Sequence, residues 1–153
     1  MVINVLEWLE KSAEKYNDKI AYSDEESSLT FLQVKSLAQS IGSALIERGA
    51  DGNPIAVFSG RSVMTVAAFL GVVYSGCSYA PIDSKLPRAR IEKIMETLSP
   101  SIILTDGENC DFVKELGFDD EKIVLLEDAI RHKADDEKLK KIRRFSNEND
   151  PLY

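Results

Sequence analysis

The segment from Pro54 to Thr105 constrains the fold more than any other part of this 153-residue chain, because short apolar runs alternate in it with helical patterns. Three apolar runs are too short for helices and predict buried strands. They lie at 55–58, 78–82 and 102–104. Between them, 63–74 is apolar on nearly every face, and 87–98 carries apolar residues three and four positions apart. Because each helix returns the chain by a right-handed crossover, the pattern predicts a doubly wound, mostly parallel α/β sheet with helices on both faces.

Residues at the ends of these segments set the predicted boundaries. Ser62 offers a hydroxyl as N-cap of the helix 63–74, and Gly76 ends that helix because glycine accepts a left-handed conformation. Pro87 fits the first turn of the next helix, which Pro100 prevents from continuing. About a dozen residues are too few to cross a bilayer, which requires about 20, so the apolar helix belongs to a buried core.

A first helix is predicted from Val5 to about Tyr16. Asn4 and Glu7 have the spacing of a capping box, and Ile3 and Trp8 occupy the apolar positions that flank such a box. The face expected to be buried consists of Leu6, Leu9, Ala13 and Tyr16. The face expected in solvent consists of Glu10, Lys11, Glu14 and Lys15.

A small antiparallel hairpin is predicted between residues 19 and 29, with turn residues at 24–27. The helix after it has the clearest start signal in the chain. Thr30 is its N-cap, and Gln33 completes a capping box. Gly49 stands just past the expected end of this helix.

Weaker signals follow the core: a turn at 106–107, a short helix at 111–116 and a fourth parallel strand at 123–126. The segment 131–144 is dense in charge, and we interpret it as part helix and part solvated linker. We therefore divide the chain into an α/β subdomain, 1–130, and a charged linker with the start of the next strand, 131–153. An apolar element begins at Pro151–Tyr153 where the chain stops, which predicts that it is cut from something longer.

The net charge of the chain is −7, so long-range electrostatics disfavour nucleic acid or an anionic membrane as a partner. A basic cluster could hold a polyanion, but acidic neighbours at 135–137 and the acidic total argue against it. The cluster consists of Lys138, Lys140, Lys141, Arg143 and Arg144. No secretory signal is recognisable, and Cys77 and Cys110 lie in or beside apolar segments. We expect reduced thiols in a cytoplasmic protein, with a disulfide as the alternative.

One segment has part of the pattern of a nucleotide-binding motif. Gly71–Ser78 shows the glycine spacing of a Walker phosphate loop, with Cys77 where the lysine belongs. It ends a helix before a strand, whereas a phosphate loop leads from a strand into a helix, so we interpret it as helix packing and a C-cap. His132 is the only histidine and is expected to be exposed. Neither a metal cluster nor a Ser/His/Asp triad can be built from such a chain.

Ligands of open α/β sheets bind at the loops beyond the carboxyl ends of the strands. These loops are 59–62, 83–85 and 105–107. Arg61, at a helix N-terminus, could bind an anion. We favour a structural role in which Arg61 pairs with Asp83 or caps a neighbouring helix. We assign no catalytic, cofactor-binding or metal-binding role to any residue.

Five short segments, taken together in their order and spacing, carry a family resemblance. LTFLQV at 29–34 resembles the signature LTYxEL, and RS at 61–62 followed by YSGCSYAPID at 74–83 resembles RS…LKAGxAYVPID. PRARI at 87–91 and IILT at 102–105 resemble the PxxRI and LLT segments that come next. These segments are similar to those of the adenylate-forming superfamily, above all the adenylation domains of nonribosomal peptide synthetases and D-alanine–carrier-protein ligases. The departures at Ser75, Cys77 and Ser78 exchange small residues for small residues, and Ala80 stands where the family has valine.

The resemblance covers nearly the whole chain and about the first third of a family member. It implies a parent enzyme that activates a carboxylic acid with ATP and magnesium and passes the acyl group to a carrier-protein or CoA thiol. The family's phosphate-binding loop, substrate pocket and C-terminal lysine would follow Asp150–Tyr153. We therefore expect this chain to lack activity and cofactors, to pack against the rest of its adenylation domain, and to self-associate through the exposed truncation surface.

Two other interpretations stay open at this point. The chain could be a complete α/β interaction or anion-binding module that uses Arg61 and the loop at Asp83. Such a module predicts an ordered C-terminus and little exposed apolar surface. A flavodoxin-like receiver domain is the weaker option, since Asp83 and Asp106 are too sparse for the acidic cluster that it requires.

Overall fold

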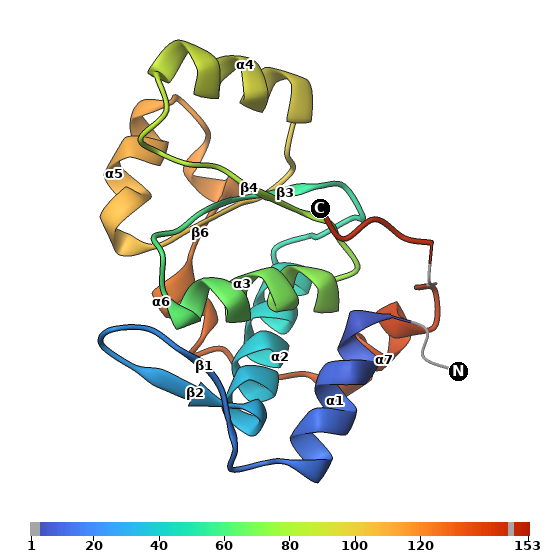
Figure 1. Cartoon of the computed structure of the whole chain (residues 1–153). Coiled ribbons are helices and arrows are strands. Elements are labelled where there is room, and N and C mark those ends of the chain that lie inside the picture. The colour runs from blue at the N-terminus through green and yellow to red at the C-terminus, as the bar shows by residue number, and fades with distance from the viewer. Residues whose placement is uncertain (1–3, 147–148) are drawn as a thin grey trace.

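Four parallel strands form the centre of the fold (Figure 1). The computed structural model describes residues 4–146 and 149–153. The strand order is β4-β3-β5-β6, with β3 at Ile55–Phe58, β4 at Tyr79–Pro81, β5 at Ile103–Thr105 and β6 at Ile123–Leu125. In register, Val57 of β3 lies between Pro81 of β4 and Leu104 of β5. The four predicted strands are all present, and the sheet is parallel as expected.

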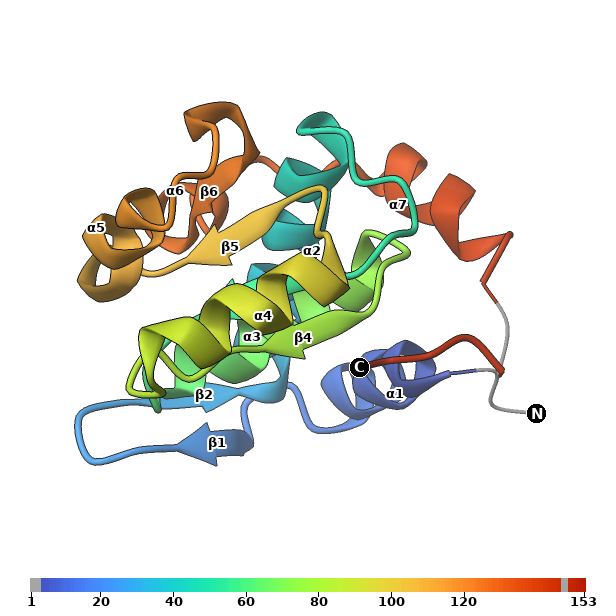
Figure 2. The same ribbon diagram turned by 90° about the horizontal axis from the view of Figure 1, so that it is seen from above.

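Helices cover both faces of this sheet (Figures 1 and 2). One layer holds α4 (Arg88–Leu98) and α5 (Gly107–Glu115); the other holds α1 (Val5–Lys15), α2 (Phe31–Glu47), α3 (Val63–Tyr74), α6 (Leu126–Ala129) and α7 (Asp136–Arg143). A 3₁₀ turn, Asp120–Lys122, precedes β6. Alternate residues of β3 belong to two separate apolar clusters: Ile55 and Val57 face the layer of α3, and Ala56 and Phe58 face that of α4. The predicted doubly wound architecture is confirmed.

Glycines allow α2 and α3 to approach each other closely. A Cβ atom on Gly71 would lie 2.5 Å from Cβ of Ile41, and one on Gly42 would lie 2.6 Å from Cβ of Tyr74. Neither distance leaves room for two carbon atoms in a close-packed interior. Gly71 of the Walker-like spacing therefore serves helix packing, and Gly76, with φ of 80°, ends α3 as predicted.

The hairpin and the start of α2 also match the predictions. β1 (Ile20–Ser23) and β2 (Ser28–Thr30) pair antiparallel in a separate two-stranded sheet. The capping box of α2 is formed, because the Gln33 amide donates to Thr30 Oγ1 at 3.2 Å and the Thr30 amide donates to Gln33 Oε1 at 2.8 Å. Gly49, with φ of 90°, follows the end of this helix.

The start of α1 differs from the predicted capping box. Oδ1 of Asn4 accepts a hydrogen bond from the Leu6 amide at 2.9 Å instead of from the amide of Glu7. Ile3, one of the two predicted flanking residues, lies outside the described residues. Its predicted partner Trp8 is 65% exposed. Asn4 thus caps the helix without a reciprocal bond from Glu7, and its side chain accepts from the second helical residue instead of the third.

Three side chains differ from the exposure that the sequence predicts. Tyr16 lies just past the end of α1 and is exposed, although its spacing placed it on the buried face. Glu10 is partly buried, because its Oε1 accepts a hydrogen bond from the Tyr74 hydroxyl at 2.8 Å. His132 is not freely solvated, since its Nε2 lies 2.7 Å from Oε2 of Glu47.

Two helices begin differently from the prediction. Ser62 is the N-cap residue of α3, but its hydroxyl makes no capping hydrogen bond. The Val63 amide donates instead to Oδ2 of Asp24 in the hairpin, at 2.8 Å. The predicted turn at 106–107 is the start of a helix, because the Asp106 side chain caps α5 from its first residue, Gly107.

The charged segment contains one helix, α7, whose Leu139 is buried against α1, α2 and α3. Beyond it, the chain end lies along β4 (Figure 2), where the Leu152 carbonyl accepts a hydrogen bond from the Tyr79 amide at 2.8 Å. The division of the chain at residue 130 remains a prediction. No helix in the described ranges combines the length and the apolar character that a membrane span requires.

Candidate functional site

The topology places a candidate site where β3 and β5 end. From β3 the chain passes to β4 on one side and later to β5 on the other, so the connections diverge between β3 and β5. Such switch points are where doubly wound sheets bind ligands. A cleft of about 770 Å³ lies here, bounded by the hairpin turn, the loop after β3 and the starts of α5 and α6.

Asp106 joins the two strand ends that border this cleft. Its Oδ2 accepts the Gly60 amide at 2.7 Å, while its Oδ1 accepts the Asn109 amide at 2.9 Å and Nδ2 of the same residue at 2.7 Å. One carboxylate therefore caps α5 and ties it to the exit of β3. The sequence predicts Asp106 as a turn residue. An Asp directly before a helical segment is also an N-cap signal, and that signal could have identified its role.

Asp24 holds the hairpin turn against the start of α3. Its Oδ2 accepts the Val63 amide, and its Oδ1 accepts the amides of Glu26 at 2.9 Å and Ser27 at 2.8 Å. Hydrogen bonds from these three amides, that of Val63 first, lower the pKa of Asp24. The contact spans 39 residues, so no local sequence signal could have shown it.

Arg61 lies at the rim of the same cleft and is exposed. Within the described residues its guanidinium makes no hydrogen bond or ion pair, and the predicted pair with Asp83 is not formed. Asp83 does not line the cleft, and its Oδ1 accepts the amide of Lys85 at 2.9 Å. The structure therefore does not bring together the two residues that the anion-binding interpretation combined.

The cleft does not fit the phosphates of a nucleotide. Three backbone amides in or beside its lining donate to carboxylates: Gly60 donates to Asp106, Val63 to Asp24, and Gly107 to Glu127 at 3.0 Å. Glu25, Glu26 and Glu108 add further negative charge to the lining. Phosphate binding requires free amides and positive potential, and here the amides are occupied and Arg61 stands among acidic side chains. Among the residues that the structure describes, no group of three His, Cys, Asp or Glu side chains is placed to hold a metal ion.

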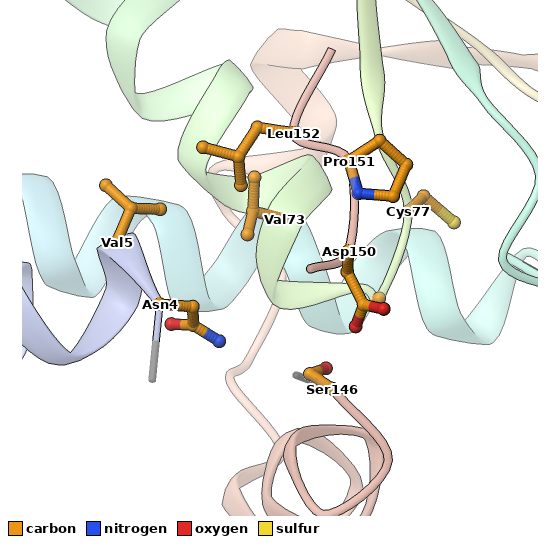
Figure 3. Close-up of a pocket in the computed structure, with 9 residues that line it drawn as sticks. Asn4, Val5, Val73, Cys77, Ser146, Asp150, Pro151 and Leu152 are labelled. Atoms are coloured by element: carbon orange, nitrogen blue, oxygen red, sulfur yellow. The ribbon is translucent and has the colours of Figure 1, made fainter. Parts of the chain in front are cut away.

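A second, smaller cavity of about 160 Å³ lies at the opposite end of β4 (Figure 3). Val5, Val73 and Leu152 form its apolar side, and Asn4, Ser146 and Asp150 gather on its polar side. It lies between the start of α1, the end of α3 and the chain end. The switch-point rule does not place ligands at this amino end of the strands.

The segments that carry the family resemblance hold structural positions. Residues 29–34 run from the end of the hairpin into the first turn of α2. Residues 74–83 run from the end of α3 through β4, where Ser75 Oγ donates to the Val72 carbonyl at 2.6 Å. Tyr74 and Ser75 are both buried. Residues 29–34 and 74–83 therefore position the helix and the edge strand, whereas Arg61 and Ser62 of the resembling RS segment line the cleft.

Comparisons with known proteins agree on one family for this chain. The family of AMP-binding enzymes matches residues 9–153. Tyrocidine synthase 1 of Brevibacillus parabrevis is 31% identical over 122 residues, which cover 79% of this chain and 11% of that protein. A D-alanine–D-alanyl carrier protein ligase of Listeria welshimeri is 29% identical over 110 residues, covering 71% of this chain and 22% of that protein.

A solved structure shows the same fold. The nonribosomal peptide synthetase FmoA3 is 25% identical with a TM-score of 0.75, over 87% of this chain and 14% of that one. The chain thus spans a small part of the length of each of these three relatives. The sequence match, the parallel sheet and the structural positions of the resembling segments agree, and the chain belongs to the family of AMP-binding enzymes, with the fold of the N-terminal subdomain of their adenylation domains.

Proposed function

We propose that the chain is the N-terminal part of a ligase that activates a carboxylic acid with ATP and magnesium and passes the acyl group to a thiol. The observation that carries the proposal is the family match over residues 9–153. A carboxylate becomes a good electrophile once AMP is its leaving group, and this step requires donors and a metal ion around the phosphates. Because relatives include a D-alanyl carrier protein ligase, the proposed acceptor is a carrier-protein thiol, with CoA as the alternative.

The role proposed for this chain within such an enzyme is that of a scaffold. Its switch-point cleft presents carboxylates where a nucleotide needs donors, and Arg61 is exposed. The phosphate-binding and acid-binding groups are therefore expected from the rest of the adenylation domain, which we propose as the partner of this chain. By itself the 153-residue chain is expected to bind no ATP and to catalyse nothing.

Isothermal titration with ATP and magnesium tests this proposal. The titration compares the 153-residue chain with the chain continued through the remainder of an adenylation domain. We expect heat of binding from the longer protein alone. Acid-dependent exchange of pyrophosphate into ATP, measured on both proteins, is likewise expected from the longer protein and not from the 153-residue chain.

A matched pair of variants separates the outcomes. If the short chain binds ATP, and Arg61→Ala removes the binding while the exposed Arg131→Ala keeps it, the cleft is a nucleotide site and the scaffold role is wrong. If neither protein binds ATP or exchanges pyrophosphate, the ligase assignment itself fails. Pyrophosphate exchange by the short chain alone would overturn the proposal that it is inactive.

A stand-alone anion-binding module is the second candidate, and the contacts in the cleft weigh against it. The amides of Gly60 and Val63 already donate to carboxylates, and Arg61 and Asp83 do not meet. These groups therefore do not form an anion-binding site. Self-association stays a proposal. Exposed apolar side chains that it could cover lie on or beside α1, on the hairpin, at the start of α2 and toward the chain end: Trp8, Tyr16, Ile20, Tyr22, Leu32, Phe145 and Tyr153.

A further inference from the structure

Residues 132–146, named here the strap, pack on α2 and α3, and α7 lies beside α1 (Figure 1). The strap includes α7 and connects the β6 side of the sheet with the chain end on β4. On α2, His132 contacts Glu47 at 2.7 Å, and the Asp135 amide donates to the buried Ser43 Oγ at 2.9 Å. The segment that the sequence predicts as part linker is therefore attached to the domain at several separate points.

The far end of the strap is held by a clasp at Glu10 of α1. Oε1 of Glu10 accepts the Tyr74 hydroxyl at 2.8 Å, and its Oε2 accepts Nη2 of Arg143 at 3.1 Å. Close by, a Cβ atom on Gly76 would lie 2.7 Å from Cγ2 of Ile142. One carboxylate thus links α3, which is part of the core, to the last turn of α7.

The attachment of the strap is weak compared with the packing of the helices beneath it. Leu139 is the one buried side chain that α7 contributes among its described residues. The two side-chain contacts that hold the strap to α1 and α2 are partly exposed and therefore contribute little. Side-chain exposures are 30% and 62% for the hydrogen-bonded His132 and Glu47, and 24% and 32% for the ion pair of Arg143 and Glu10.

One contact in the clasp is also incomplete. Nη1 of Arg143 is buried and has no hydrogen-bond partner within the described part of the chain. A buried donor without a partner disfavours the state that buries it. By contrast, α2 and α3 interdigitate through Gly42 and Gly71, and both also pack on the sheet in an apolar cluster to which the strap contributes no residue.

We infer that the strap is a releasable element, which opens locally while the sheet, α2 and α3 stay folded, and that the Glu10–Arg143 clasp sets how often it opens. Local opening of this kind is expected where few apolar contacts and several exposed polar contacts hold a segment. Release exposes the cluster around Leu6, Tyr74 and Leu139. The inference concerns the folded 153-residue chain and is independent of the ligase proposal.

Amide hydrogen exchange on the complete 153-residue chain tests the inference. Amides of α7 are expected to exchange faster than those of α3, and added salt is expected to speed exchange in the strap alone, because it screens the partly exposed ion pairs. Glu10→Gln keeps an acceptor for the Tyr74 hydroxyl and removes the charge that faces Arg143. We expect this variant to speed exchange in α7 about two- to fivefold, with exchange in α3 unchanged.

Glu96→Gln is the matched control, since it removes the same charge from an exposed position on α4, in the layer on the other face of the sheet, where Glu96 has no partner within the described residues. This variant is expected to exchange like the parent chain. The inference is overturned if α7 and α3 exchange at one common rate without dependence on salt, or if Glu10→Gln accelerates α7 and α3 equally. The salt series on the parent chain decides the question even if a variant fails to fold.

Discussion

At the scale of single residues, Asp24 and Asp106 hold positions where an α/β sheet often binds an anion. Each carboxylate accepts a backbone amide at the end of β3 or the start of α3 and also closes its own turn or caps its own helix. An anion at a helix N-terminus is stabilised by the free amides and the helix dipole, whether it comes from a ligand or from the chain. Here the chain supplies the anions itself, which supports the proposal that this end of the sheet serves as scaffold.

Asp24→Asn is expected to reduce stability in a pH-dependent manner. The pKa of Asp24 is lowered in the folded state, so its carboxylate contributes stability above the pKa that it has in the unfolded chain. That contribution is lost as the pH falls through the folded pKa. The difference in melting temperature between the parent chain and Asp24→Asn is therefore expected to be largest at neutral pH and to shrink below about pH 4.

Thermal unfolding followed by circular dichroism between neutral and acidic pH measures this difference. Asp18→Asn removes an exposed carboxylate that accepts no hydrogen bond within the described residues, and it is expected to melt like the parent chain throughout. A constant difference for Asp24→Asn over the whole pH range would contradict the assignment, because the lost stability would then not depend on ionisation.

At the scale of elements, the contact between α2 and α3 organises the layer on one face of the sheet. Gly42 and Gly71 face each other's helix, so the backbones come close enough for Ile41 and Tyr74 to pack directly on the opposite helix. Both helices then bury their apolar residues on β3 and β5. The wide apolar surface of α3 is thus explained by α2 on one side and the sheet on the other.

Gly71→Ala is expected to destabilise the chain by about 1–3 kcal/mol, because its methyl group would overlap Ile41 and force the two helices apart. Gly60→Ala is the matched control: the nearest atom to its Cβ, Oε2 of Glu108, is 3.7 Å away, so its effect is expected within about 1 kcal/mol of zero. Urea denaturation measures both free energies of unfolding. Equal midpoints for the two variants would show that the helices are not in close contact.

At the scale of the whole molecule, the described residues form three apolar clusters around the four-stranded sheet: one under α2 and α3, one under α4 and α5, and one between α1, α2 and α7. The two cysteines differ in their exposure to solvent. Cys77 is 4% exposed within the first cluster, and Cys110 is partly exposed on α5. Both are free thiols, as the sequence predicts.

Native thiol labelling is expected to modify Cys110 and spare Cys77 until the chain unfolds. Cys77 is inaccessible to the reagent. Burial also raises the pKa of Cys77, so little of it is present as the reactive thiolate. Mass spectrometry after a short exposure to a maleimide is expected to show one adduct, and two adducts in urea. Two adducts under native conditions would show that the first cluster opens without global unfolding.

The elements that the sequence predicted well are those whose signals are local. The buried strands are apolar runs bounded by turn residues, and the start of α2 is a reciprocal bond between Thr30 and Gln33, three residues apart. Gly76 ended α3 as predicted because its left-handed conformation is a property of one residue. The family resemblance likewise depended on short segments, and the comparisons confirmed it.

The sequence by itself therefore determined the parallel sheet and most of the succession of strands and helices along the chain, since hydrophobic periodicity and capping act over a few residues. Short matching segments determined the family. The 3₁₀ turn Asp120–Lys122 and the short helix α6 had no such signal. Only the tertiary structure decided that Asp24, and not Ser62, caps α3, that Glu10 joins Tyr74 to Arg143, and that the strap is docked. Those contacts join residues 39 to 133 positions apart. Which polar groups meet across such distances depends on how the apolar faces pack, and no local pattern in the chain encodes it.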